Sequence, residues 1–151
     1  MKIRMPEQLV SKEVSPVRYT EDAEDITPQK LRGFFVGWPN KPSPEVHLQL
    51  LKKSDHRVIA LNKKGEVIGF ITAITDGVLS AYIPFLEVLP DYQERGIGQE
   101  LAKRMLEKLK DLYMIDLSCD PQVQPFYERL GMKQSVGMCL RNYPAQNGEG
   151  K

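Results

Sequence analysis

Two glycines, Gly96 and Gly98, lie between an apolar run and a long stretch of helical periodicity, an arrangement suited to binding anions. Glycines at alternate positions let consecutive backbone N–H groups point inward with no Cβ in the way. The positive end of the helix that we expect to begin at Gln99 would add to the attraction. The sequence therefore predicts a phosphate or diphosphate site over Gln93–Gly98.

Two familiar phosphate loops fit this stretch poorly. The nucleoside-triphosphate loop requires Lys and then Ser or Thr after its last glycine, whereas Gln99 and Glu100 follow Gly98 here. The dinucleotide fingerprint requires a third small residue where this chain has Leu101, although Asp116 does lie about 20 residues further on. The first loop is excluded, and the second is a weak interpretation.

The stretch Gln93–Gly98 resembles the coenzyme A loop of the GNAT N-acetyltransferase superfamily, which reads Gln/Arg-x-x-Gly-x-Gly/Ala after a strand ending in Val-x-Pro. Further along, Phe126–Met132 resembles the family's Phe/Leu-Tyr-x-x-x-Gly-Phe segment. The resemblance covers roughly residues 58–143 well and the first 55 residues poorly. It implies an α/β fold of the GNAT acyl-CoA N-acyltransferase type, with a central mixed sheet splayed between the fourth and fifth strands and flanked by helices.

The resemblance also implies acetyl-CoA as cosubstrate. In the family, the fourth strand parts from the fifth and its free backbone binds the pantetheine arm; here Pro84 predicts an unpaired or bulged position in that strand. Arg95 either contacts the diphosphate or lies in solvent. Relatives often carry an asparagine where this chain has Asp120, and an ionised carboxylate cannot donate the same hydrogen bond. The expected coenzyme-binding residues are Leu86, Val88, Leu89, Gln93, Glu94, Arg95, Gly96, Ile97, Gly98, Gln99, Asp120 and Tyr127.

Tyr127 and Glu87 are the expected catalytic residues. By resemblance, Tyr127 is the general acid that protonates the leaving thiolate, and its ordinary pKa of about 10 keeps the proton in place at neutral pH; the alternative is an aromatic anchor for a short helix. An amine acceptor must lose a proton before it attacks. Glu87, opposite Leu86 and Val88 by strand alternation, is the first choice of base. Asp120, water, or a surface role for Glu87 remain alternatives.

The acceptor site is expected near Glu87, Phe34 and Trp38; the resemblance implies that Phe34 and Trp38 belong to the segment that arches over the acceptor pocket. The same aromatic residues could instead bury themselves on the sheet. An acetyl-cysteine route through Cys119 is disfavoured, because His47 and His56 lie far away in the sequence and leave the thiol without a base. No metal site is expected.

Local patterns predict the elements that position these residues. Alternation and turn residues indicate strands, a 3.6-residue period indicates helices, and Gly65 and Gly131 mark a hairpin turn and a helix end. Residues 1–16 are expected to form a loose arm. The predicted strands are 17–19, 57–61, 67–74, 81–89, 113–118 and 136–143, and the predicted helices are 27–37, 43–51, 99–112 and 124–130.

Composition fits an ordinary cytoplasmic protein of one domain, over residues 1–144, with a disordered tail at 145–151. The chain has 151 residues, a formal net charge of +1 and 41% hydrophobic residues, so neither nucleic acid nor membrane is an expected partner. We expect an N-acetyltransferase that moves an acetyl group to a primary amine of a small molecule or peptide by direct attack in a ternary complex. A non-catalytic acyl-CoA-binding or interaction module is the alternative, and a homodimer is considered possible.

Overall fold

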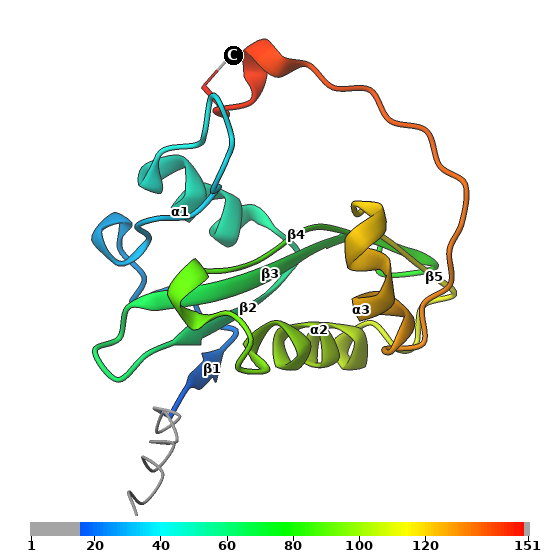
Figure 1. The fold of residues 1–151 in the computed structure, drawn as a ribbon, viewed down its shortest axis with the longest axis horizontal. Coiled ribbons are helices and arrows are strands. Elements are labelled where there is room, and N and C mark those ends of the chain that lie inside the picture. The colour runs from blue at the N-terminus through cyan, green and yellow to red at the C-terminus, as the bar shows by residue number, and fades with distance from the viewer. Residues whose placement is uncertain (1–15, 150–151) are drawn as a thin grey trace, which may run out of the picture.

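The computed structural model describes residues 16–149, which form a five-stranded sheet with helices on both faces (Figure 1). The predicted arm lies outside this range except for Pro16. The elements are β1 (Arg18–Thr20), η1 (Pro28–Lys30), α1 (Pro44–Lys53), β2 (His56–Leu61), β3 (Val67–Thr75), β4 (Ser80–Val88), η2 (Pro90–Tyr92), α2 (Ile97–Lys108), β5 (Met114–Asp116), η3 (Pro121–Val123), α3 (Gln124–Glu128) and η4 (Tyr143–Ala145).

The strands lie in the order β1-β2-β3-β4-β5. The first four are antiparallel neighbours, and β5 runs parallel to β4 because α2 crosses over between them. The β2–β3 hairpin turns at Gly65, whose φ of 76° belongs to the left-handed region that glycine adopts freely. The sheet is therefore mixed, as the sequence predicted.

Strand alternation divides the core into two layers. In β2, Val58 faces α2 and Ile59 faces the α1 side, and both are almost completely buried. The α2 layer includes Leu101 and Met105, and α3 packs against it. The other layer joins the sheet to α1 and to the loop that precedes it. Figure 1 shows α1 above the sheet and α2 below it.

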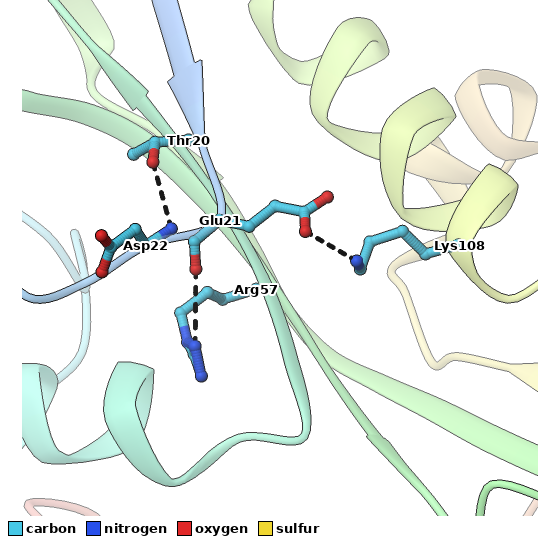
Figure 2. A network of polar contacts seen from close by, with 5 residues as sticks. All are labelled: Thr20, Glu21, Asp22, Arg57 and Lys108. Atoms are coloured by element: carbon cyan, nitrogen blue, oxygen red, sulfur yellow. Dashed lines mark hydrogen bonds and ion pairs between the residues drawn. The ribbon is translucent and has the colours of Figure 1, made fainter.

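Polar contacts fix β1 and its following turn to elements on both sides (Figure 2). The Nζ of Lys108, at the end of α2, lies 2.8 Å from a carboxylate oxygen of Glu21. Arg57 of β2 donates to the backbone oxygen of Glu21 at 3.5 Å and, through Nε, to that of Leu51 at 2.6 Å. These contacts attach the turn after β1 to α2 and to the β2–α1 region. They lie at the edge of the sheet opposite to β5.

The pairing of β4 with β5 stops after a short stretch. It joins Ser80 to Met114 and continues only to Tyr82 and Asp116. Just beyond, the β3–β4 register shifts so that Ala73 alone faces both Ile83 and Pro84, which is a β-bulge. The predicted irregularity at Pro84 and the predicted splay between the fourth and fifth strands are both confirmed.

Two predicted elements are wrong. Residues 27–37 form only η1 and then a loop, because Gly33, Phe35 and Gly37 all have positive φ values and a helix cannot continue through them. Residues 136–143 are not a strand: residues 133–142 run extended outside the layers, without strand hydrogen bonds to other described residues.

The remaining predicted elements are present with shifted ends. The helix predicted from Gln99 begins at Ile97, and the helix predicted to end at Leu51 continues to Lys53. Beyond residue 144, the N–H of Asn40 donates to the Gln146 side chain at 3.0 Å; the domain boundary there stays a prediction. Among residues 16–149, no helix has both the length and the apolar character needed to cross a membrane.

Candidate active site

The loop before α2 presents a row of free N–H groups. Glu94 and Gly96 have φ values of 62° and 82°, and this alternation of left-handed residues turns neighbouring N–H groups toward one side. The first helical bond runs from the N–H of Glu100 to the oxygen of Gly96. Within residues 16–149, no acceptor pairs with the N–H groups from Glu94 to Gln99. The loop has the donors that a diphosphate requires.

Gly98 lies where α2, β4 and α3 meet. A Cβ placed on it would be 3.6 Å from a methyl group of Val88 and 3.9 Å from the ring of Phe126. Phe126 in turn packs on the core layer that contains α2. The two sequence motifs, far apart in the chain, therefore meet at the start of α2.

The backbone of β4 has free groups beyond the bulge. The N–H of Leu89 donates to Ile68 of β3 at 2.9 Å. Because hydrogen-bonded residues alternate in an antiparallel pair, Leu86 and Val88 direct their backbone groups to the opposite side, where β5 has already separated. The Nε2 of Gln93 donates to the Val88 oxygen at 2.9 Å, which ties the loop to this edge. The exposed edge is thus Leu86 and Val88, while Leu89 is engaged with β3.

Of two predicted coenzyme-binding side chains, that of Arg95 contacts Tyr92 and that of Asp120 is exposed. The guanidinium of Arg95 stacks over the ring of Tyr92, 5.5 Å from its centroid. Asp120 is exposed, and its backbone oxygen accepts the N–H of Val123 at the start of η3. The Asp120 carboxylate therefore caps no helix through its side chain and is accessible to solvent.

Tyr127 is half-buried on α3, with its ring at right angles to that of Phe126 and 4.9 Å away between centroids. Burial, together with the nearby thiol of Cys119, raises the pKa of Tyr127 to about 12. In the described part of the chain, its hydroxyl forms no hydrogen bond with another residue. The phenol is therefore protonated at neutral pH and available as a donor.

Glu87 faces the α1 side of the sheet, as alternation predicted, and its carboxylate binds the loop before α1. One oxygen accepts the N–H of Phe35 at 2.8 Å and the other accepts the N–H of Val36 at 3.1 Å. Phe35 has a φ of 60°, a costly conformation for a bulky residue. The sequence offered no signal for this pairing, because the donors are backbone groups about 50 residues away.

The aromatic residues of this loop divide between core and surface. Phe34 is buried against Phe70 and His47, with centroid distances of 5.3 and 5.1 Å. Trp38 is 37% exposed and lies 5.0 Å from Phe35, between ring centroids. Phe34 thus packs the loop onto the core, and Trp38 lies at the surface of the loop.

His47 is a buried residue whose burial was not predicted from the sequence. It is 1% exposed, and neither ring nitrogen has a partner among residues 16–149. Its ring lies 4.4 Å from that of Phe70 and 5.0 Å from that of Phe35, between centroids. Burial lowers its pKa to about 4, so it is neutral at pH 7. The sequence did contain one indication of this burial, because His47 lies about one helical turn before the apolar Leu51 and therefore on the same face of α1.

Comparison with a family model and with solved structures finds acetyltransferases in each case. The family model for the Acetyltransferase (GNAT) family matches residues 23–132. The crystal structure of a candidate acetyltransferase from Deinococcus radiodurans R1 is 47% identical, with a TM-score of 0.85 over 87% of this chain and 92% of that one. A GNAT family acetyltransferase from Streptococcus pneumoniae TIGR4 is 28% identical, with a TM-score of 0.66 over 84% of this chain and 97% of that one.

A curated relative, the uncharacterized N-acetyltransferase ycf52 of Gracilaria tenuistipitata var. liui, is 33% identical over 104 residues, or 64% of this chain. This chain spans only 55% of that relative's length. The family match nevertheless includes β4, the glycine loop and the Tyr127 segment, which are the parts of the candidate site. The chain therefore belongs to the GNAT acetyltransferase family.

Proposed function

We propose that this protein is an acetyl-CoA-dependent N-acetyltransferase that moves the acetyl group directly to a primary amine. The observation that carries the proposal is the junction of the glycine loop with the open edge of β4. The glycine loop supplies free N–H groups for a diphosphate, and the open edge of β4 supplies free backbone groups for an amide-containing arm. The Gln93 side chain joins the two at Val88.

The backbone of β4 would hold the thioester. Leu86 and Val88 are the residues whose N–H and C=O groups are turned away from β3. A backbone N–H there, with Val88 as the candidate, can polarise the thioester carbonyl and stabilise the oxyanion that forms on attack. Loss of one such donor costs about 2.7–4 kcal/mol in other enzymes.

The transfer needs one base and one acid. The amine nitrogen attacks the carbonyl carbon, the C–S bond breaks, and the coenzyme leaves as a thiolate that takes the Tyr127 proton. The proton of the amine passes to Glu87, directly or through water. Both Glu87 oxygens already accept one N–H, yet each retains a second lone-pair position. Asp120 is the alternative base because it is exposed beside η3.

The acceptor would approach from the side of Glu87 and Trp38. Trp38 lies 6.2 Å from Phe85, between ring centroids, and Phe85 is on the same face of β4 as Glu87. Phe34 would support the acceptor site indirectly, because its burial in the core fixes the loop that carries Trp38. An aromatic surface beside a carboxylate suits a protonated amine, which both can attract.

Thiol release from acetyl-CoA, measured with a panel of amines, tests the proposal. The panel would include polyamines, aminosugars, amino acids, arylalkylamines and peptide N-termini, and binding of acetyl-CoA alone would be measured in parallel. We expect acceptor-dependent release with at least one class and a matching N-acetylated product. Tight binding with no release above the buffer rate would favour the non-catalytic acyl-CoA-binding module.

A further inference from the structure

The last described residues, 143–149, form a compact turn that we call the C-terminal turn. It begins with η4, where the N–H of Ala145 donates to the oxygen of Asn142 at 3.0 Å. The N–H of Gly148 then donates to the oxygen of Ala145, also at 3.0 Å. These hydrogen bonds give the end of the described chain a defined shape.

The C-terminal turn lies against the loop before α1. The N–H of Asn40, which belongs to that loop, donates to the side-chain oxygen of Gln146 at 3.0 Å, although 106 residues separate the two. Figure 1 shows the turn, in red, beside the chain that leads into α1. Gln146 is half-buried there. The contact therefore joins the end of the described chain to the loop that carries Trp38.

A second contact joins the C-terminal turn to α1 itself. A Cβ placed on Gly148 would lie 2.7 Å from a methyl group of Val46, in the first turn of α1, which is closer than a real Cβ approaches another atom. Gly148 also has a φ of 76°, in the left-handed region that favours glycine. The backbone at Gly148 thus packs directly on α1, and a larger residue would not fit.

The second half of the loop before α1 has few backbone donors. Pro39, Pro42 and Pro44 have no N–H, so these positions cannot donate a backbone hydrogen bond. The N–H of Asn40 lies between two of these prolines, and Gln146 supplies its acceptor. The Gln146 contact is therefore an anchor for a stretch that has few other ways to be held.

Trp38 lies between two anchors of this loop. Glu87 accepts two backbone N–H groups in the first half of the loop, and Gln146 accepts one in the second half. The N–H of Trp38 donates to the oxygen of Phe35 at 3.2 Å, and its ring lies 6.2 Å from that of Phe85, between centroids. Release of either anchor would therefore allow the Trp38 ring to move away from Phe85.

We propose that the C-terminal turn is part of the acceptor site, and that Gln146 is a positioning residue that holds Trp38 in place for the incoming amine. The inference rests on the proposed function, because it takes the Trp38 side of β4 as the acceptor side. Gln146 acts through the backbone of Asn40 and not on the reacting atoms. Loss of its acceptor oxygen should weaken acceptor binding and leave the coenzyme site, at the glycine loop and the open edge of β4, intact.

Three substitutions in the full chain test the role of Gln146. Gln146→Met keeps an unbranched side chain of similar length and removes the acceptor oxygen. Gln146→Glu keeps an oxygen that can accept the N–H of Asn40. Gln49→Met makes the same change at an exposed position of α1 and is the matched control.

Quenching of Trp38 fluorescence by acrylamide gives a readout that does not depend on activity, since Trp38 is the single tryptophan of the chain. We expect stronger quenching in Gln146→Met than in the parent, because the ring is less well held. Gln146→Glu and Gln49→Met should be quenched like the parent. Equal quenching in Gln146→Met and Gln49→Met would overturn the proposal.

Steady-state kinetics with an accepted amine gives the second readout. Gln146→Met should raise the KM for the amine about two- to tenfold, the range that one neutral hydrogen bond corresponds to, with kcat close to that of the parent. The KM for acetyl-CoA should not change, and Gln146→Glu should restore the parental KM for the amine. An equal rise in both KM values would indicate a general loss of structure and would overturn the proposal. So would a Gln146→Glu chain that behaves like Gln146→Met.

Gly148→Val tests the C-terminal turn as a whole. The added side chain would collide with Val46 and would require a left-handed φ, so the turn should detach from α1 while the circular dichroism of the fold is retained. We expect stronger quenching of Trp38 and a higher KM for the amine, each at least as large as in Gln146→Met. Parental values of both would contradict the proposal.

The two readouts separate failure of this inference from failure of the proposed function. If amines are acetylated and Trp38 is quenched more strongly in Gln146→Met, but the KM for the amine stays parental, the proposed function stands and the positioning role is wrong. If the parent acetylates no amine of the panel, the proposed function fails and the acceptor role fails with it, while the quenching series still shows whether Gln146 holds Trp38.

Discussion

The carboxylate of Glu87 accepts the backbone N–H of Phe35 at 2.8 Å, although 52 residues separate them. This contact joins the proposed base on β4 to the aromatic loop over the acceptor side. A hydrogen bond to a charged group contributes about 1.5–3 kcal/mol, which is enough to offset the strain of a left-handed phenylalanine. Glu87 therefore has a positioning role in addition to the proposed chemical one.

Substitution of Glu87 by Gln separates these two roles. The amide oxygen of Gln can still accept the N–H of Phe35, while its NH2 group cannot accept that of Val36, and the capacity to take a proton at neutral pH is lost. We expect kcat to fall by about 10²–10⁴-fold if Glu87 is the base. Trp38 is the single tryptophan of the chain and lies against Phe35, so its emission should shift less in Glu87→Gln, which keeps the Phe35 hydrogen bond, than in Glu87→Ala.

Glu87→Ala is the matched control, because it removes both acceptors and should shift Trp38 emission to longer wavelength. Unchanged turnover in Glu87→Gln would exclude Glu87 as the base and turn attention to Asp120 or water. If Trp38 emission shifts equally in both variants, the loss of turnover in Glu87→Gln would be explained by displacement of the loop, and only the positioning role of Glu87 would be supported.

Gly98→Val should weaken acetyl-CoA binding by about tenfold or more, equivalent to about 1.4 kcal/mol. The first added carbon fits, at 3.6 Å from Val88, but the branched methyl groups would cover the N–H groups at the start of α2. Calorimetric titration measures the affinity, and Gly98→Ala is the control that adds only the tolerated carbon. A folded Gly98→Val chain with parental affinity would contradict the loop assignment.

Tyr127→Phe should lower kcat at least tenfold and leave acetyl-CoA affinity nearly unchanged, since the ring and its packing on Phe126 remain. The raised pKa of Tyr127, about 12, also predicts that its ionisation causes no loss of parental activity up to about pH 10. Single-turnover rates are the appropriate measurement, with the exposed Tyr113→Phe as control. Parental rates in Tyr127→Phe would leave it as a packing residue.

His47 should make the fold sensitive to acid. Its pKa is lowered to about 4, so between about pH 6.5 and 4 the unfolded chain binds a proton that the folded chain excludes. Stability is therefore retained above about pH 6.5 and lost as the pH falls, by about 3 kcal/mol at most. Urea titrations of the parent and His47→Phe at pH 7 and 5 measure this loss.

The loss between pH 7 and 5 should be smaller in His47→Phe than in the parent. His56→Asn, at the half-buried start of β2, is the control and should keep the parental acid sensitivity. Equal losses in the parent and His47→Phe would assign the acid sensitivity to other groups.

Elements governed by local rules were predictable from the sequence. The β2–β3 hairpin follows from alternation and the left-handed turn at Gly65, and α1 begins where Ser43 accepts the N–H of Val46. The start of α2 was misplaced by two residues, because Gly96 takes the left-handed position and Ile97 already belongs to the helix. Such boundaries depend on backbone angles that residue types only suggest.

Features governed by distant contacts were not predictable. Leu31 and Phe34 are buried as their spacing suggested, yet the helix expected over 27–37 gives way to a loop that Glu87 holds from β4. The alternating pattern at 136–143 predicted a strand, and this prediction is wrong because a strand requires a hydrogen-bonded partner, which the backbone of residues 133–141 lacks among the described residues. The glycine loop and Tyr127 could be proposed as site residues from the sequence because each lies in a short local motif.

Rapid quenching of a single turnover, with intact-mass analysis of the protein, tests direct transfer most directly. The protein is first held with acetyl-CoA alone and then mixed with an accepted amine. Direct transfer predicts no acetyl group on the protein before mixing, followed by thiol and N-acetylated amine that appear together at equal rates. A stoichiometric acetyl group on Cys119 before mixing, which then passes to the amine and is absent in Cys119→Ala, would contradict the account.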